Sequence, residues 1–184
     1  MAASRRPWAE ALLRFWFREL APAQWFSRDE TVDAALRARF GRWLTALGTA
    51  PAESFLDGVR TARAAILLFD QVPRNLYRDD PRAYAFDPLA REIVRLVLAR
   101  DWDRGLDRSA RHFIYMPMMH SEQIADQCLC LRLFRDLDNA FLYRFAADHH
   151  AMIARFGRFP HRNEVLGRPS SPAEERAVAE GAAS

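Results

Sequence analysis

The chain of 184 residues contains no lysine, only two cysteines and no long apolar run. Its 27 basic residues are therefore all arginines, set against 24 acidic residues. Arginine keeps its charge and presents a planar fork of donors, which suits paired contacts, although biased codon usage is the simpler explanation for the missing lysine. Because charges of both signs alternate along the chain, we expect an ion-paired surface and no nucleic-acid partner.

The scarcity of cysteine and of apolar runs also bounds the cellular context. Cys128 and Cys130 are two residues apart in an expected helix, so they point to different faces, which argues against a disulfide and for a reducing compartment. Arg5-Arg6 is followed by Pro7 and a charged amphipathic pattern, unlike a signal peptide. No segment approaches the roughly 18 consecutive apolar residues of a membrane span. We expect a cytoplasmic protein.

The apolar residues recur at intervals of three and four, and no period-two segment is present, so we predict an all-α fold. Short connections between about seven helices favour antiparallel helical hairpins in a single domain over residues 1–184, with a frayed tail from about residue 181. Periodicity does not distinguish a compact bundle from a stack of hairpins. The first stripe, rich in Trp and Phe over residues 8–20, is expected to pack in the core, with a homodimer interface or a membrane surface as the alternatives.

Helix ends are predicted from prolines, glycines and capping residues. Pro73 is expected to end one helix and Pro117 to start another. Gly157 is expected to end the last long helix, which Asp138 or Asn139 would cap at its start. Two sequences match a capping box, in which a hydroxyl and a carboxylate three residues later satisfy backbone N–H groups: Ser27 with Glu30, and Ser171 with Glu174.

The first polar segment at a helix end is Asp70-Gln71-Val72-Pro73-Arg74-Asn75. Asp70 and Arg74 are four residues apart and can form an ion pair if the helix continues to Arg74. Such a pair would tie down a helix end or contribute to a ligand site. The residues alone do not choose between these roles.

The second polar segment lies around His120 and Glu122. On a helix beginning at Pro117, His120 would share a face with Gln123 and Gln127. A hydrogen-bonded polar face is the common outcome of such a pattern, and a metal site with distant histidines is the alternative.

The third polar segment is an arginine-rich loop that follows an apolar helix. His149 lies in line with Phe145, Met152 and Phe156, so it is expected to point inward. The loop beyond it holds four arginines balanced by one acid: Arg155, Arg158, Arg162 and Arg168, with Glu164. Such a concentration can bind phosphate or carboxylate, and arginines after a helix can equally satisfy its last carbonyl groups.

Three segments together resemble the signature blocks of one family: Leu67 to Asn75, Tyr115 to Glu122, and Arg155 to Arg168. The family is the uncharacterised bacterial domain of unknown function 924 (DUF924), and the similarity extends to Phe15-Trp16-Phe17 and Asp87-Pro88. The resemblance implies an all-helical fold similar to tetratricopeptide-repeat proteins. It implies no known activity.

We therefore predict a helical binding protein whose polar site receives an anionic small ligand or a carboxylate-bearing peptide. The expected ligand-binding residues are Arg74, Asn75, Arg155, Arg158, His161, Arg162 and Asn163, supported by Asp70, Gln71, His120, Glu122 and His149. One alternative is a metal-assisted hydrolase using His120, Glu122, His149 and His161, and another is a purely structural polar network. The usual nucleotide, nucleophile and zinc motifs are absent, so no cofactor is expected and the question of catalysis stays open.

Overall fold

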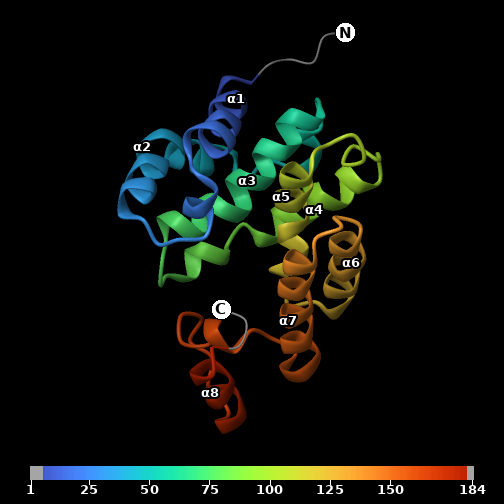
Figure 1. The fold of residues 1–184 in the computed structure, drawn as a ribbon. Coiled ribbons are helices and arrows are strands. Elements are labelled where there is room, and N and C mark those ends of the chain that lie inside the picture. The colour runs from blue at the N-terminus through green and yellow to red at the C-terminus, as the bar shows by residue number, and fades with distance from the viewer. Residues whose placement is uncertain (1–5, 182–184) are drawn as a thin grey trace. The chain divides into compact units, whose positions relative to one another are not determined.

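The computed structural model describes residues 6–181, which group into two compact units (Figure 1). Unit 1 comprises the residues up to Arg78 together with Arg82–Ile114, and unit 2 comprises Asp79–Pro81 and the residues from Tyr115 onward. The single domain over residues 1–184 stays a prediction. Arg5 and the tail beyond Gly181 lie outside the described residues.

The all-α prediction is confirmed, since the described part of the chain contains eight α-helices and no strand. The α-helices are α1 (Pro7–Arg14), α2 (Glu30–Leu47), α3 (Val59–Leu76), α4 (Asp87–Leu98), α5 (Arg108–Met119), α6 (Ile124–Arg135), α7 (Ala140–Phe156) and α8 (Pro172–Ala179). Short 3₁₀ segments lie between them: η2 (Pro22–Trp25), η3 (Ala52–Phe55), η4 (Pro81–Tyr84) and η5 (Pro160–Arg162). Helix α5 begins in unit 1, and its residues from Tyr115 onward belong to unit 2.

Helix α3 forms the centre of unit 1. Every residue from Ala64 to Pro73 is buried, as expected for a helix that is covered on all sides. Helices α1, α2 and α4 all contact α3 (Figure 1), and its alanines allow their backbones to approach closely. The predicted aromatic stripe joins the same core, since Trp8, Phe15 and Trp16 are each at most 5% exposed.

Helix α1 does not end as a regular α-helix but continues as the π-helical turn η1 (Phe15–Glu19). The backbone N–H of Leu20 donates to the carbonyl of Phe15 at 3.0 Å, which is the i to i+5 bond of a π-helix. This wider turn rotates the residues that follow relative to α-helical spacing. Such turns occur often at functional sites, and this one contains Phe17 and Arg18.

Unit 2 is built on the α6–α7 hairpin and on the segment after it. Asn139 caps α7, as predicted, by accepting a hydrogen bond from the backbone N–H of Leu142 at 3.0 Å. Gly157 ends α7 in the left-handed conformation (φ 70°), also as predicted. The chain then turns back, so that the 3₁₀ turn η5 packs against α8 and buries Phe159 completely.

Both proline-based predictions are wrong. Pro73 lies inside α3, which continues to Leu76, and Pro117 lies inside α5, so that α6 begins only at Ile124. A proline removes one N–H, but surrounding tertiary contacts can hold the helix together through it. His120 therefore lies in the turn after α5 and does not share a helix with Gln127.

One capping box is confirmed and the other is wrong. Ser171 accepts from the N–H of Glu174 at 3.3 Å while the Glu174 carboxylate accepts from the N–H of Ser171 at 2.8 Å. At the start of α2 the capping residue is Asp29, not Ser27. The Asp29 carboxylate accepts from the N–H of Thr31, which explains why the helix begins two residues later than expected.

None of the described helices is suited to crossing a membrane. Within residues 6–181, none combines the length and the apolar character that a bilayer crossing requires.

Candidate functional site

The polar segment of α3 is an ion-paired network within unit 1. Because α3 continues past Pro73, Arg74 reaches back to Asp70, with 3.4 Å between its Nη1 and Asp70 Oδ1. Both of its Nη atoms also donate to the Asp87 carboxylate at 2.9 Å, so α3 is clamped to the start of α4. Asn75 donates to the Gln71 carbonyl at 2.9 Å. All of these contacts are internal to the protein.

The charges on this network are held firmly. Burial alone would lower the pKa of Arg74, but the carboxylates of Asp70 and Asp87 more than offset burial, so the pKa is raised. Breaking the ion pairs of a largely buried cation between two carboxylates is costly. An anionic ligand could bind Arg74 only by displacing one of these carboxylates, which gains little free energy. This geometry favours a structural role for Arg74.

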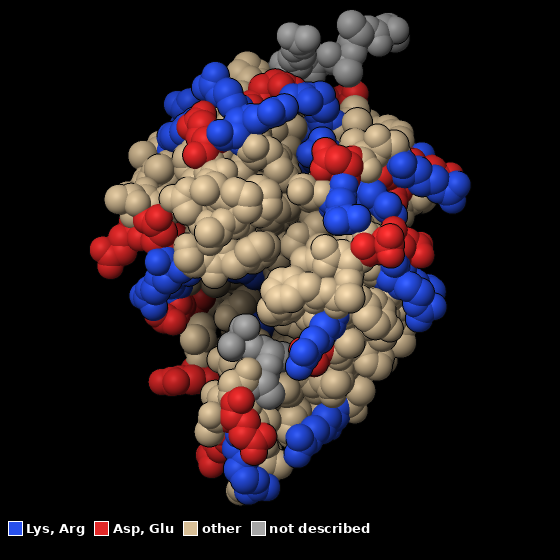
Figure 2. Space-filling view, in the orientation of Figure 1, with Lys and Arg blue, Asp and Glu red and all other residues tan. Residues whose placement is uncertain are grey.

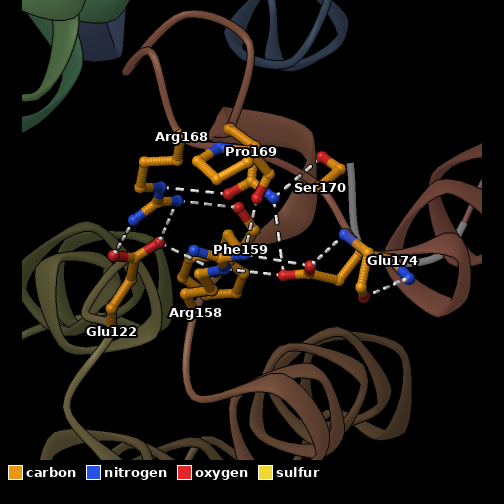
Figure 3. Close-up of polar contacts among 9 residues, drawn as sticks. Glu122, Arg158, Phe159, Arg168, Pro169, Ser170 and Glu174 are labelled. Atoms are coloured by element: carbon orange, nitrogen blue, oxygen red, sulfur yellow. Dashed lines mark hydrogen bonds and ion pairs between the residues drawn. The ribbon is translucent and has the colours of Figure 1, made fainter.

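The first clamp in unit 2 joins the loop after α7 to α8 (Figure 3). Arg158 donates from Nε and Nη2 to the two oxygens of Glu174, at 2.6 and 3.0 Å, and from Nη2 to the Pro169 carbonyl at 2.9 Å. The Arg158 hydrogen bond holds the pKa of Glu174 well below its ordinary value. Glu174 therefore caps α8 and fixes the preceding loop at the same time.

The second clamp joins the same loop to the connection between α5 and α6. Both Nη atoms of Arg168 donate to Glu122, at 2.8 and 2.9 Å, and the backbone N–H of Phe159 donates to Glu122 at 2.8 Å (Figure 3). Asn163 links the two clamps, because it accepts from Arg168 Nε and lies 3.4 Å from Glu174. Burial would raise the pKa of Glu122, but Arg168 and the Phe159 N–H lower it overall.

Phe159 lies at the centre of the predicted histidine and arginine residues of unit 2. The ring centres of His149 and His161 lie 5.5 and 5.4 Å from its own, and the Arg162 guanidinium lies 4.5 Å from its ring centre. His149 is half-buried, as the prediction of an inward side chain requires, whereas Phe145 on the same stripe is 44% exposed. The side chains are brought together by packing, not by helix periodicity.

The two histidines are uncharged at neutral pH. Burial lowers the pKa of His149 to about 4, and the charges of His120 and Arg162 act in the same direction. Burial and Arg162 likewise lower the pKa of His161 to about 4. A carbonyl oxygen only accepts, so the 2.9 Å contact between His149 Nδ1 and the Phe145 carbonyl assigns the proton to Nδ1.

The alternative metal site is not formed by these side chains. Among the residues described, no three His, Cys, Asp or Glu side chains are placed to hold one metal ion. Glu122 is already bonded to Arg168 and to the backbone N–H of Phe159. The geometry gives metal-assisted hydrolysis no support.

The remaining predicted residue, Arg155, differs from the arginines of the clamps. It is exposed at the end of α7, and its guanidinium lies 4.7 Å from the ring centre of Phe156. On the face drawn in Figure 2, arginine and carboxylate residues lie next to one another in many places, which agrees with the expected ion-paired surface. The predicted ligand site in residues 155–163 is thus rich in cations but already largely paired within the protein.

A cavity of about 900 Å³ lies in unit 1, and none of the predicted site residues lines it. Its walls come from α1, the π-turn, η2, the start of α3 and the start of α5. They comprise Pro7, Glu10, Ala11, Leu13, Arg14, Phe17, Arg18, Trp25, Arg60, Arg63, Asp107 and Ser109. Four arginines and two carboxylates therefore share one cavity with two aromatic rings.

The four arginines of this cavity are not equivalent. Arg60 donates to the Glu10 carboxylate from Nε and Nη2, and Arg14 Nε lies 3.2 Å from Glu19 Oε1. Arg18 and Arg63 make no ion pair or hydrogen bond within residues 6–181. The Arg63 guanidinium lies 5.3 Å from the ring centre of Phe17.

Arg63 carries its charge in a partly desolvated place. Burial lowers the pKa of its guanidinium, the charge of Asp107 opposes this effect, and the neighbouring charge of Arg60 adds to it. Arginine stays protonated under all ordinary conditions, so Arg63 remains a cation. A partly buried cation that lacks a bonded anion is suited to receiving one.

Sequence reasoning missed this cavity because its walls come from four separate stretches of the chain. One signal was available: Arg14 with Arg18, and Arg60 with Arg63, place like charges three or four residues apart on a helix, which is unfavourable without a nearby anion. The π-turn was not visible in the periodicity. It places Phe17 and Arg18 in the cavity wall.

The family model described as "Bacterial protein of unknown function (DUF924)" matches residues 12–182. The chain belongs to the DUF924 family. No curated protein matches this DUF924 chain.

A solved structure supports the same family fold. It is described as a protein of unknown function, ATU0120, from Agrobacterium tumefaciens, with 34% sequence identity and a TM-score of 0.88. The match covers 94% of this chain and 97% of that chain. The predicted family resemblance is confirmed, and neither DUF924 description names an activity or a ligand.

Proposed function

We propose that this DUF924 protein is a helical binding protein for an anionic small ligand, and that the ligand binds in the cavity of unit 1. The observation that carries the proposal is Arg63, a partly desolvated cation in a cavity of about 900 Å³ without a bonded carboxylate. Arg18 adds a second cation to the same wall. Cavities of this volume fall within the range of small-molecule sites.

The chemistry of the wall suits an organic acid. Arginine binds carboxylate and phosphate groups through two parallel, charge-assisted hydrogen bonds. Glu10 and Asp107 also line the cavity, but Glu10 is bonded to Arg60, and Asp107 accepts from the N–H of Ala110 at the start of α5. The positive charge in excess is therefore available to a ligand.

The predicted site in residues 155–163 is the weaker candidate. Arg158 and Arg168 are bonded to Glu174 and Glu122, which favours the structural network among the alternatives for this region. Binding of an anion or a carboxylate-bearing peptide there stays a prediction. The finer expectations of tetratricopeptide-like stacking, a cytoplasmic location and a homodimer also stay proposals, the first supported by the α2–α3 and α6–α7 pairs within each unit.

The test is anion binding to purified protein by isothermal titration calorimetry, with inorganic phosphate and citrate as probes. Replacing one charge-assisted donor pair weakens binding by about 10-fold to 100-fold, so Arg63→Gln is expected to lower the affinity by at least about 10-fold. Arg42→Gln is the matched control. Arg42 is exposed on α2, its guanidinium lies 4.9 Å from the Trp43 ring centre, and it does not line the cavity.

Thermal unfolding of the same variants separates binding from structure. Removing a partly buried cation without a bonded anion is expected to leave the stability of Arg63→Gln unchanged or higher, because functional sites are commonly kept at a cost in stability. A lower melting temperature together with unchanged affinity would assign Arg63 a structural role. Absence of any anion binding by the unaltered protein would refute the proposed function.

A further inference from the structure

The unit 1 cavity contains a continuous run of a cation and two aromatic rings. The Arg63 guanidinium lies 5.3 Å from the ring centre of Phe17, and the Phe17 ring meets Trp25 edge to face at 6.0 Å. Both rings line the cavity and are half-buried. The anion-binding group and the aromatic wall are therefore neighbours, and one small molecule can contact both.

The aromatic wall is held rigidly from behind. Trp25 Nε1 donates to the Trp16 carbonyl at 2.8 Å, which fixes the indole. The ring centre of Phe113 lies 5.1 Å from that of Trp25 and 5.6 Å from that of Phe17. Rings supported in this way lose little freedom when a ligand binds, so their contacts with the ligand are not offset by an ordering cost. The two rings therefore form a prearranged surface for a ligand.

The size of the cavity argues for an organic ligand with an apolar body. At about 900 Å³ it is near the upper end of the usual range for small-molecule sites, so a bare phosphate or carboxylate would leave most of it to water. Pro7, Ala11 and Leu13 line it together with the rings. Apolar atoms of a ligand would remove these side chains from water, which a bare anion would not do.

Resting on the proposed function, we infer that the ligand is an organic acid anion that carries an aromatic ring system, with its acidic group on Arg63 and Arg18 and its ring against Phe17 and Trp25. Aromatic groups pair with such rings in edge-to-face or offset geometry, beyond the gain from burial alone. A planar ring also stacks on a guanidinium, which a saturated ring of the same size does less well.

The test compares acids that differ only in the aromaticity of the ring. Isothermal titration calorimetry of the unaltered protein uses 2-naphthoate against decahydro-2-naphthoate, and 2-naphthyl phosphate against its decahydro analogue. We expect each aromatic acid to bind about 3-fold to 10-fold more tightly than its saturated counterpart. The carboxylate and phosphate arms identify the preferred acidic group.

Two variants assign the preference to this wall. Phe17→Leu is expected to remove most of the aromatic preference, whereas Phe26→Leu is expected to keep it, because Phe26 is 62% exposed beside Trp25 and does not line the cavity. Equal affinities for the aromatic and saturated acids would overturn the inference while leaving anion binding intact. An unchanged preference in Phe17→Leu would overturn the assigned wall. Because the ligand pairs are compared on the unaltered protein, the test stands even if Phe17→Leu fails to fold.

Discussion

Removing the Glu122 carboxylate is expected to loosen the C-terminal segment of unit 2. Glu122 accepts hydrogen bonds from Arg168 Nη1 and Nη2 and from the backbone N–H of Phe159. Phe159 is fully buried in the folded protein, so its N–H loses its hydrogen-bond acceptor if the carboxylate is absent. The Glu122→Ala variant therefore breaks one partly exposed ion pair and leaves one buried donor unsatisfied.

The two losses differ in size. The side chains of Glu122 and Arg168 are 27% and 23% exposed, so solvent limits the loss of the ion pair to about 1 kcal/mol. An unsatisfied buried N–H costs about 1–3 kcal/mol, which makes it the larger contribution. We expect Glu122→Ala to lower the free energy of unfolding by about 3 kcal/mol, equivalent to a fall in Tm of about 6–12 °C for a chain of this size.

Glu122→Gln separates the two contributions, because its amide oxygen still accepts from the Phe159 N–H while the charge is lost. We expect this variant to cost about 1 kcal/mol. The measurement is urea unfolding followed by circular dichroism. Glu164→Ala is the matched control: Glu164 is exposed in the loop that contains Arg168, and its removal is expected to change stability by less than about 0.5 kcal/mol.

Two results would refute this reasoning. If Glu122→Ala is as stable as the Glu164→Ala control, the clamp does not hold the C-terminal segment. If Glu122→Gln costs as much as Glu122→Ala, the ion pair and not the backbone N–H carries the stabilisation. A double-mutant cycle with Arg168→Met measures the coupling between the two side chains directly.

Two further predictions concern the buried charges and the histidines. The pKa values of His149 and His161 are about 4 in the folded protein, against an ordinary value of 6.5. Between pH 4 and 6.5 the unfolded chain therefore binds more protons than the folded protein. The free energy of unfolding should fall as the pH drops from about 6.5 towards 4. Urea unfolding at several pH values should give a shallower pH dependence for His161→Gln, and an unchanged slope would contradict the prediction. Arg74→Ala removes the cation between two buried carboxylates and should cost about 3 kcal/mol of unfolding free energy, with Arg100→Ala, an exposed arginine of unit 1, as the control. Equal stability of these two arginine variants would count against the clamp between α3 and α4.

The local parts of the fold were predictable where the deciding contacts are close in sequence. The N-cap Asn139, the glycine end at Gly157 and the capping box of Ser171 with Glu174 depend on residues within one helical turn. The two proline-based predictions failed because distant contacts override the local preference. Pro73 and Pro117 lie inside helices because surrounding packing stabilises the helix despite the missing N–H.

The candidate site divides in the same way. The sequence identified polar side chains that share a neighbour within one unit: Arg158 and Asn163 both bond Glu174, and His149 and His161 both pack against Phe159. It did not identify their partners. Glu174 pairs with Arg158, which is 16 residues away in the sequence, and Glu122 pairs with Arg168, which is 46 residues away. A loop that reads as a free cluster of cations is, in the folded protein, mostly neutralised.

The sequence by itself determined that this chain is helical and belongs to its family, because a 3.6-residue period and ordered motifs are properties of neighbouring residues. Only the tertiary structure decided which arginines are paired and which are available. Arg63 could not be told from Arg158 by its neighbours in the sequence, since both lie near other arginines. The difference arises when the chain folds, which brings a carboxylate to one guanidinium and an open, aromatic-lined cavity to the other.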